Sequence, residues 1–130
     1  MTEPSATKTT AAGRPKLLLV IEDDPRAAQW LAMLAQHLGH KAVIALNGDA
    51  ALDLVRRAPP DMIFVDLVLP DIEGHDLITE LRSMPGLQGV KIYVVSAHGD
   101  EESISKSRAV GAQEHFVKPM RLADLQRLLQ

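Results

Sequence analysis

The stretch Leu17-Leu18-Leu19-Val20-Ile21-Glu22-Asp23-Asp24-Pro25 points to the fold class of this chain. The strand that it predicts, at 16–21, is apolar without polar alternation, which is typical of a strand buried on both faces. Asp24 and Pro25 predict the start of a helix, because aspartate caps helices and proline suits their first position. A buried strand that leads directly into a helix indicates an α/β fold with a parallel sheet.

The same alternation recurs along the chain. Further strands are predicted at 41–45, 61–65, 90–95 and 113–117, and a helix follows each of them. The helix predicted at 101–110 has few apolar positions and is interrupted by serines, so we expect it to be the least firmly packed. The final helix is predicted at 121–130. Five βα units imply a parallel sheet with helices on both faces and right-handed crossovers.

Composition limits the classes of function. The chain has 130 residues, 46% of them hydrophobic, which suits one domain with one core. A net charge of −3 argues against nucleic-acid binding, and no run approaches the length of a membrane span. The absence of cysteine excludes disulfides and thiolate metal sites. Residues 1–15 lack the apolar core of a signal peptide, so we expect a disordered leader or linker, a domain at 16–130 and a cytoplasmic location.

Polar side chains follow four of the predicted strands. Glu22 and Asp23 follow the first strand, Asp66 the third, Ser96 the fourth and Lys118 the fifth. The carboxyl ends of parallel strands lie at one edge of a sheet, so we expect these groups to meet there. Taken singly, each has an ordinary explanation, such as helix capping for the acidic run. Their joint placement favours a site for a divalent cation and a phosphoryl group.

Charge balance supports the same interpretation. Three carboxylates held together repel one another by several kcal/mol at an intermediate effective dielectric constant, an order-of-magnitude figure. Mg²⁺ can offset this repulsion, because it prefers one or two carboxylates together with waters and phosphate oxygens. Lys118 would add a fixed positive charge. A phosphoryl donor at Asp66 would then meet a nucleophile and compensating cations already in place.

The motifs around these residues resemble those of the receiver domain of bacterial two-component response regulators, the family of the chemotaxis response regulator. They lie at 18–25, 65–74, 94–98 and 111–119. Each motif is weak alone, but all four occur in order on one (βα)5 pattern, from about residue 16 to the C-terminus. The resemblance implies a flavodoxin-like, doubly wound, five-stranded parallel sheet with strand order 2-1-3-4-5.

The resemblance also implies a role for each site residue. Asp66 would be the phosphoacceptor, and Mg²⁺ would be held by Asp23, Asp66, the backbone carbonyl of Val68 and, through a water, Glu22. Ser96 and Lys118 match the hydroxyl and the lysine that contact the phosphoryl group, and the Lys118-Pro119 bond is expected to be cis. Such a domain is a signalling phosphoacceptor and not an enzyme, since it catalyses only its own phosphorylation and dephosphorylation.

Partners and the switch are further implications of the resemblance. The expected donor is a sensor histidine kinase or a phosphotransfer protein. The weak apolar stripe of 101–110, which lies between Ser96 and His115, makes the face formed by 101–110, 113–117 and 121–130 the expected partner or homodimer surface. Ser96 and His115 would rearrange on activation. His115 stands where the family usually has Tyr or Phe, so it adds a titratable group. His37, His40 and His75 are predicted to be surface residues without a metal role.

Three other functions remain open. A pseudo-receiver would bind a partner without phosphorylation, and only the substitution at His115 favours it. A metal-dependent phosphohydrolase with an aspartyl-phosphate intermediate would normally carry a second aspartate two residues after its nucleophile, where this chain has Val68. A flavodoxin-like cofactor carrier would need a phosphate-binding loop after the first strand, where this chain has acids.

Overall fold

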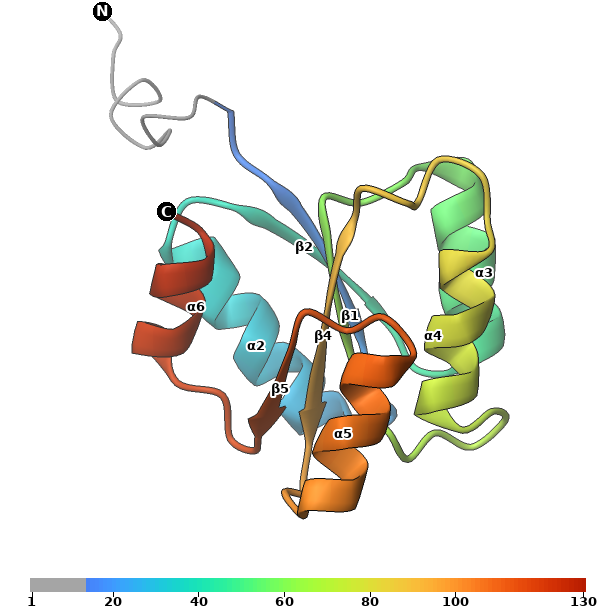
Figure 1. Cartoon of the computed structure of the whole chain (residues 1–130). Coiled ribbons are helices and arrows are strands. Elements are labelled where there is room, and N and C mark those ends of the chain that lie inside the picture. The colour runs from blue at the N-terminus through green and yellow to red at the C-terminus, as the bar shows by residue number, and fades with distance from the viewer. Residues whose placement is uncertain (1–13) are drawn as a thin grey trace, which may run out of the picture.

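The computed structural model describes residues 14–130, which form five strands and five helices in strict alternation (Figure 1). Most of the predicted leader or linker lies outside the described residues. The elements are β1 (Leu17–Ile21), α2 (Pro25–His37), β2 (Lys41–Ala45), α3 (Gly48–Arg57), β3 (Met62–Val65), α4 (Gly74–Arg82), β4 (Lys91–Ser96), α5 (Glu101–Ala109), β5 (Glu114–Val117) and α6 (Leu122–Leu128). No helix in this part of the chain is long and apolar enough to cross a bilayer.

The five strands form one parallel sheet in the order β2-β1-β3-β4-β5, as predicted. Ile21, the last residue of β1, pairs with Val65, the last residue of β3, and Val65 pairs in turn with Val94 of β4. Within the sheet, β1 lies between β2 and β3. The chain runs from β1 to β2 on one flank and then crosses to β3 on the other flank of β1. The groups that follow β1 and β3 therefore meet at the switch point of the sheet, where α/β proteins bind ligands.

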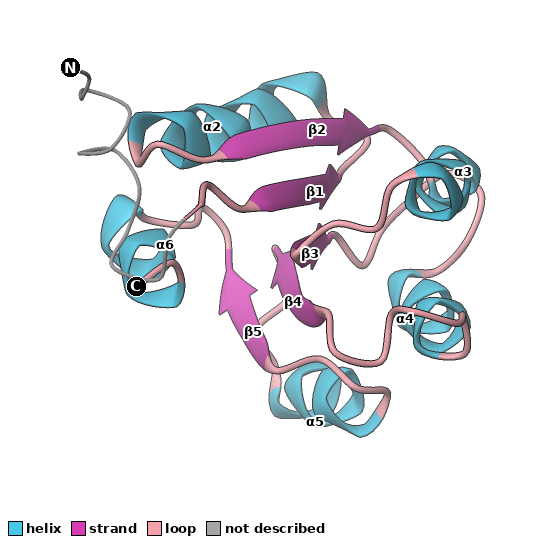
Figure 2. Cartoon of the chain, turned by 90° about the horizontal axis from the view of Figure 1, so that it is seen from above, coloured by secondary structure: helices cyan, strands magenta, loops and turns pink. Residues whose placement is uncertain are grey.

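Helices cover both faces of the sheet (Figure 2). Leu18 and Val20 of β1 pack in the cluster shared with α2 and α6, whereas Leu19 and Ile21 pack in the cluster shared with α3 and α4. Both side-chain directions of β1 are thus buried, which explains why its sequence shows no polar alternation.

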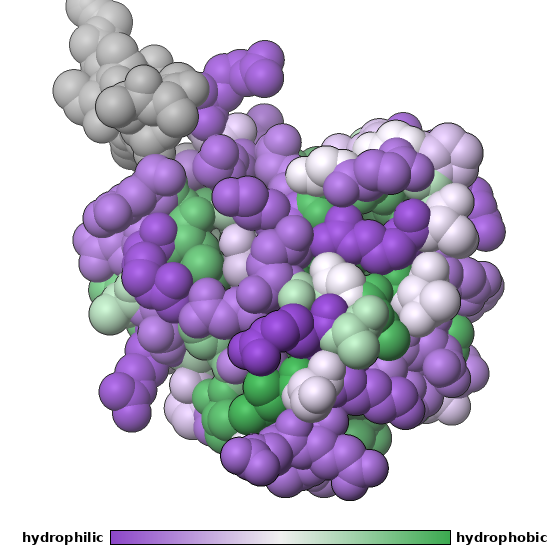
Figure 3. All heavy atoms as spheres, viewed as in Figure 1, coloured by the Kyte–Doolittle hydropathy of each residue, from purple (hydrophilic) through white to green (hydrophobic). Residues whose placement is uncertain are grey.

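Helix α5 buries one of its nine residues and α6 one of its seven, fewer than the other helices do. Ser107 is the one buried residue of α5, whereas α4 buries Leu77, Ile78 and Leu81 completely. On the face seen in Figure 3, hydrophilic residues predominate and hydrophobic residues appear only in small patches. With few apolar contacts, α5 is expected to open more readily than its neighbours.

The prediction of three surface histidines was wrong for two of them. His37 is exposed, but His40 and His75 have only 5% and 4% of their surface exposed. Nδ1 of His40 accepts a hydrogen bond from the backbone N–H of Lys16, at 2.8 Å. His75 lies on the buried side of α4, one helical turn before Ile78. The sequence argument considered only metal ligation and overlooked this helical spacing.

Candidate functional site

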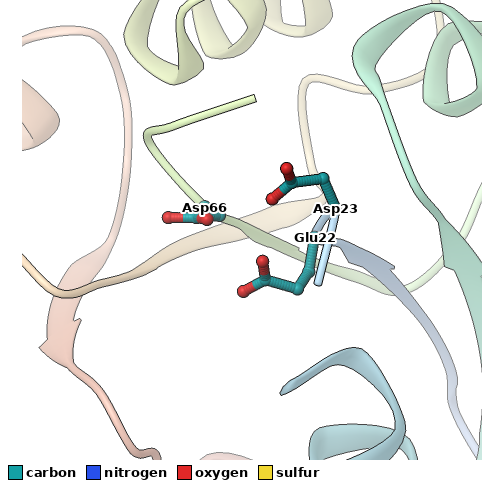
Figure 4. Close-up of side chains that lie close together, drawn as sticks. All are labelled: Glu22, Asp23 and Asp66. Carbon is teal, nitrogen blue, oxygen red and sulfur yellow. The ribbon is translucent and has the colours of Figure 1, made fainter. Parts of the chain in front are cut away.

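Three carboxylates gather at the carboxyl ends of β1 and β3 (Figure 4). One oxygen from each of Glu22, Asp23 and Asp66 lies within 4.8 Å of the others. Glu22 and Asp66 are buried, with 5% and 7% of their surface exposed, while Asp23 is exposed. The predicted cluster is therefore formed, and it opens to solvent on the side of Asp23.

Lys118 brings a positive charge to the two buried acids. Its Nζ lies 2.5 Å from Oε1 of Glu22 and 3.3 Å from Oδ2 of Asp66. The backbone N–H of this lysine donates to the carbonyl of Ser96 at 2.8 Å. The Lys118-Pro119 bond is cis, as the resemblance implied. The ammonium group thus bridges residues that follow β1 and β3 from its position after β5.

The electrostatics of the cluster follow from burial and from mutual charge. Burial raises the pKa of Glu22, and the charge of Asp66 adds to this rise, which outweighs the lowering effect of Lys118. Burial alone would lower the pKa of Lys118, but its hydrogen bond to Glu22 and the charge of Asp66 raise that pKa overall. The lysine therefore stays charged at neutral pH, and the acids remain incompletely compensated.

Backbone groups orient the acidic side chains. Oε2 of Glu22 accepts from the N–H of Asp24 at 3.1 Å, and Oδ1 of Asp66 accepts from the N–H of Val68 at 3.4 Å. The N–H of Asp66 itself donates to the carbonyl of Ile21 at 3.0 Å, which continues the β1–β3 pairing by one residue. The carboxylates are thus positioned by the strands and not by loops alone.

Helix α4 begins directly on the backbone of the phosphoacceptor candidate. A Cβ atom at Gly74 would lie 2.6 Å from the carbonyl oxygen of Asp66 and 2.6 Å from Cα of Leu67. The N–H of Gly74 also donates to the carbonyl of Leu67, at 2.9 Å. Only glycine fits this approach without displacing the backbone, so Gly74 couples the position of α4 to that of Asp66.

The two predicted switch residues, Ser96 and His115, both contact the backbone of His98. Ser96 ends β4 and is fully buried, and its Oγ accepts from the N–H of His98 at 3.0 Å. Nε2 of His115, on β5, lies 2.7 Å from the carbonyl oxygen of His98. Ser96 therefore holds the N–H of His98, and His115 holds its carbonyl.

An open pocket of about 480 Å³ lies beside the acids. Glu22, Asp66 and Lys118 line its polar end, and apolar side chains that include Trp30 and Met120 line the remainder. The indole Nε1 of Trp30 donates to the carbonyl of Met120 at 3.0 Å, which joins α2 to the loop after β5. The pocket leaves room for a group that approaches Asp66.

Some residues that shape the site were missed in the sequence. Asp71 accepts from the N–H groups of Gly48 and Asp49, each at 2.9 Å, and these bonds lower the pKa of Asp71. Asp71 therefore caps α3 from the loop after Asp66, and no local pattern signals a cap 23 residues away. Ser107 was also missed, although Ile104 lies three residues before it on the same side of the helix.

A family model of the response regulator receiver domain matches residues 18–130. The chain belongs to this family. It is a phosphoacceptor module of two-component signal transduction, as its motifs predicted, and the cluster of Glu22, Asp23 and Asp66 fits such a site.

Individual proteins and one solved receiver domain are also similar to this chain. The transcriptional regulatory protein CusR of Escherichia coli K12 is 32% identical over 108 residues, which are 83% of this chain and 47% of CusR. The sporulation initiation phosphotransferase F of Bacillus subtilis is 24% identical over 108 residues, which are 83% of this chain and 86% of that protein. The crystal structure of the receiver domain of a DNA-binding response regulator from Colwellia psychrerythraea has a TM-score of 0.81 and 26% identity, and the match covers 88% of this chain and 94% of that one. The chain spans about half the length of CusR.

Proposed function

We propose that Asp66 accepts a phosphoryl group from a sensor histidine kinase or a phosphotransfer protein, in a reaction that requires Mg²⁺. The observation that carries this proposal is the setting of the Asp66 carboxylate. It is buried beside Lys118, clusters with Glu22 and Asp23, and lines a pocket that is open to an incoming group.

The donor set fits Mg²⁺. The cluster offers hard carboxylate oxygens, one of them on the exposed Asp23, and burial leaves the acids under-compensated. Asp23 and Asp66 would hold the ion directly with the backbone carbonyl of Val68, and Glu22 would act through a water. When bound, Mg²⁺ supplies positive charge that offsets these carboxylates and the oxygens of a phosphoryl group.

The residues of the chain supply positioning and charge for the transfer. An oxygen of Asp66 forms a bond to phosphorus while the bond from phosphorus to the donor atom breaks, and the leaving group keeps that electron pair and takes up a proton. Lys118 offsets charge on the entering phosphoryl oxygens, because its Nζ already lies beside Asp66. Little covalent chemistry is required of the protein beyond this arrangement.

Ser96 and His115 are proposed to report the modification. The hydroxyl of Ser96 can donate a hydrogen bond to the new phosphoryl oxygens, and turning toward them removes its bond to the N–H of His98. The contact between Nε2 of His115 and the carbonyl of His98 is then left without this support. We place the partner or homodimer surface on the face of α5, β5 and α6, since α5 and α6 each bury only one residue.

The extent of the domain is also proposed. We assign residues 16–130 to the receiver and residues 1–15 to a leader or linker. In this proposal the chain catalyses only its own phosphorylation and dephosphorylation. The relative named a sporulation initiation phosphotransferase supports phosphotransfer as its chemistry.

The test is phosphorylation by a small donor. Incubation with phosphoramidate and Mg²⁺ should add one phosphoryl group to the intact protein, as measured by mass spectrometry, and omission of Mg²⁺ should abolish the addition. Asp66→Asn should prevent it, whereas the control Asp49→Asn, on the exposed first turn of α3, should not. Equal labelling of Asp66→Asn and the wild type would contradict the proposal.

A further inference from the structure

Two histidines and one serine form a chain of polar contacts between α4, α5 and β5. Nδ1 of His75 lies 3.1 Å from Oε2 of Glu73, and Nε2 of His75 lies 2.8 Å from Oγ of Ser107. The same Oγ lies 2.9 Å from Nδ1 of His115, whose Nε2 lies 2.7 Å from the carbonyl oxygen of His98. His75 and Ser107 are buried.

The ends of this chain fix how many protons it needs. A carboxylate and a carbonyl can only accept hydrogen bonds, so the four contacts require four hydrogens. Neutral His75, Ser107 and neutral His115 provide three. With all three neutral and His115 bonded to His98, a bare nitrogen of His75 faces the carboxylate of Glu73. One additional proton fills the fourth contact, and Ser107 can pass it between the two imidazoles.

We propose that His75, Ser107 and His115 form a binding site for one shared proton, and that this proton holds the loop at His98 in the conformation that disfavours phosphorylation. The second part rests on the proposed function. When Ser96 turns toward a phosphoryl group, the loop loses its bond to Ser96 and can carry the His98 carbonyl away. Three contacts then remain, and three neutral groups satisfy them, so the active conformation does not need the fourth proton.

Charged groups of both signs surround this chain. Glu73 and Asp76 lie at the start of α4, Lys106 and Arg108 lie on α5, and Glu114 lies on β5. Glu102 and His98 line a second pocket together with His75. Burial lowers the pKa of His75, the charges of Lys106 and His115 lower it further, and Glu73 and Asp76 oppose the shift. The surroundings of His75 therefore disfavour its protonation, and acid favours uptake of the additional proton.

Linkage gives the sign of the effect. If the active conformation releases the proton, then acid must weaken the binding of any ligand that selects the active conformation. Beryllofluoride, a mimic of the phosphoryl group, should bind the wild type less tightly at about pH 5.5 than at about pH 7.5. This loss of affinity should exceed, by roughly fivefold or more, the loss in a variant that lacks the His75–Ser107–His115 contacts.

The proton site is tested first, without any phosphoryl mimic. Nitrogen and carbon chemical shifts of the histidine rings, followed by NMR from about pH 8 to about pH 5, should show His75 and His115 titrating together with uptake of one proton. Ser107→Ala should separate the two titrations, and the exposed His37 serves as the reference in both proteins. Independent titration of His75 and His115 in the wild type would overturn the proposal.

The coupling is tested by beryllofluoride affinity at the two pH values in the wild type, in His75→Gln and in the control His37→Gln. His75→Gln should lose the additional pH dependence, and His37→Gln should keep it. Identical pH dependence in all three proteins would overturn the coupling. Failure of beryllofluoride to bind any of them would contradict the proposed function instead, and the NMR titration would still decide the proton site.

Discussion

Replacement of Lys118 by methionine would expose the charge imbalance of the acidic cluster. At 3.3 Å and an effective dielectric constant of about 20, the attraction between Lys118 and Asp66 is roughly 5 kcal/mol. Methionine avoids the cost of desolvating an ammonium group, and the side chain of Lys118 is 27% exposed, so solvent screens part of this attraction. We expect Lys118→Met to lower the free energy of unfolding by about 2–3 kcal/mol near neutral pH, slightly below the usual cost of breaking a buried ion pair.

The loss should depend on pH in a definite direction. The pKa of Glu22 is already raised in the folded protein, and removal of Lys118 raises it further. An acid whose folded pKa exceeds its unfolded pKa gains stability as pH falls through the folded value, because the folded state then binds more protons. The deficit of Lys118→Met should therefore shrink between about pH 7.5 and about pH 4.5.

Urea unfolding, followed by circular dichroism at both pH values without metal, measures this difference. Lys91→Met at the exposed start of β4 is the matched control and should change stability by less than about 0.5 kcal/mol. An equal deficit of Lys118→Met at both pH values, or no deficit near neutrality, would refute the charge argument.

Three further substitutions test the metal site, the contact of α4 with Asp66 and the packing at the opposite edge of the sheet. Asp23→Asn should weaken Mg²⁺ binding roughly tenfold or more in a titration followed by NMR, and unchanged affinity would exclude Asp23 as a ligand. Gly74→Ala should lower the free energy of unfolding by about 1–3 kcal/mol, because its Cβ would collide with the backbone of Asp66, while Gly89→Ala has open space and should not. Arg82→Lys should cost about 1–3 kcal/mol in the same assay, since the guanidinium donates to three backbone carbonyls, and wild-type stability would show these bonds to be dispensable.

Elements defined by neighbouring residues could be predicted from the sequence. Asp24 was expected to cap a helix, and its side chain accepts from the N–H of Arg26. The acidic cluster was equally accessible, because each acid directly follows a strand and the register of a parallel sheet brings those ends together.

Features that depend on how two helices pack could not be predicted. The contact of His75 with Ser107 spans 32 residues and requires the mutual placement of α4 and α5. The helical spacing of His75 and Ile78 indicates that His75 lies on the buried side of α4, but its partner on α5 has no signature in the sequence. Each of these two buried polar groups is satisfied by the other, and that partnership is visible only in three dimensions.

The most direct test of the account is chemical identification of the phosphorylated residue. An acyl phosphate on aspartate is reduced by borohydride to homoserine, which marks the modified position permanently. After phosphorylation by phosphoramidate with Mg²⁺, reduction and peptide mass spectrometry, we expect homoserine at Asp66 and at no other aspartate. Homoserine at Asp23 in place of Asp66, or phosphoprotein that yields none, would contradict the assignment of Asp66 as the phosphoacceptor.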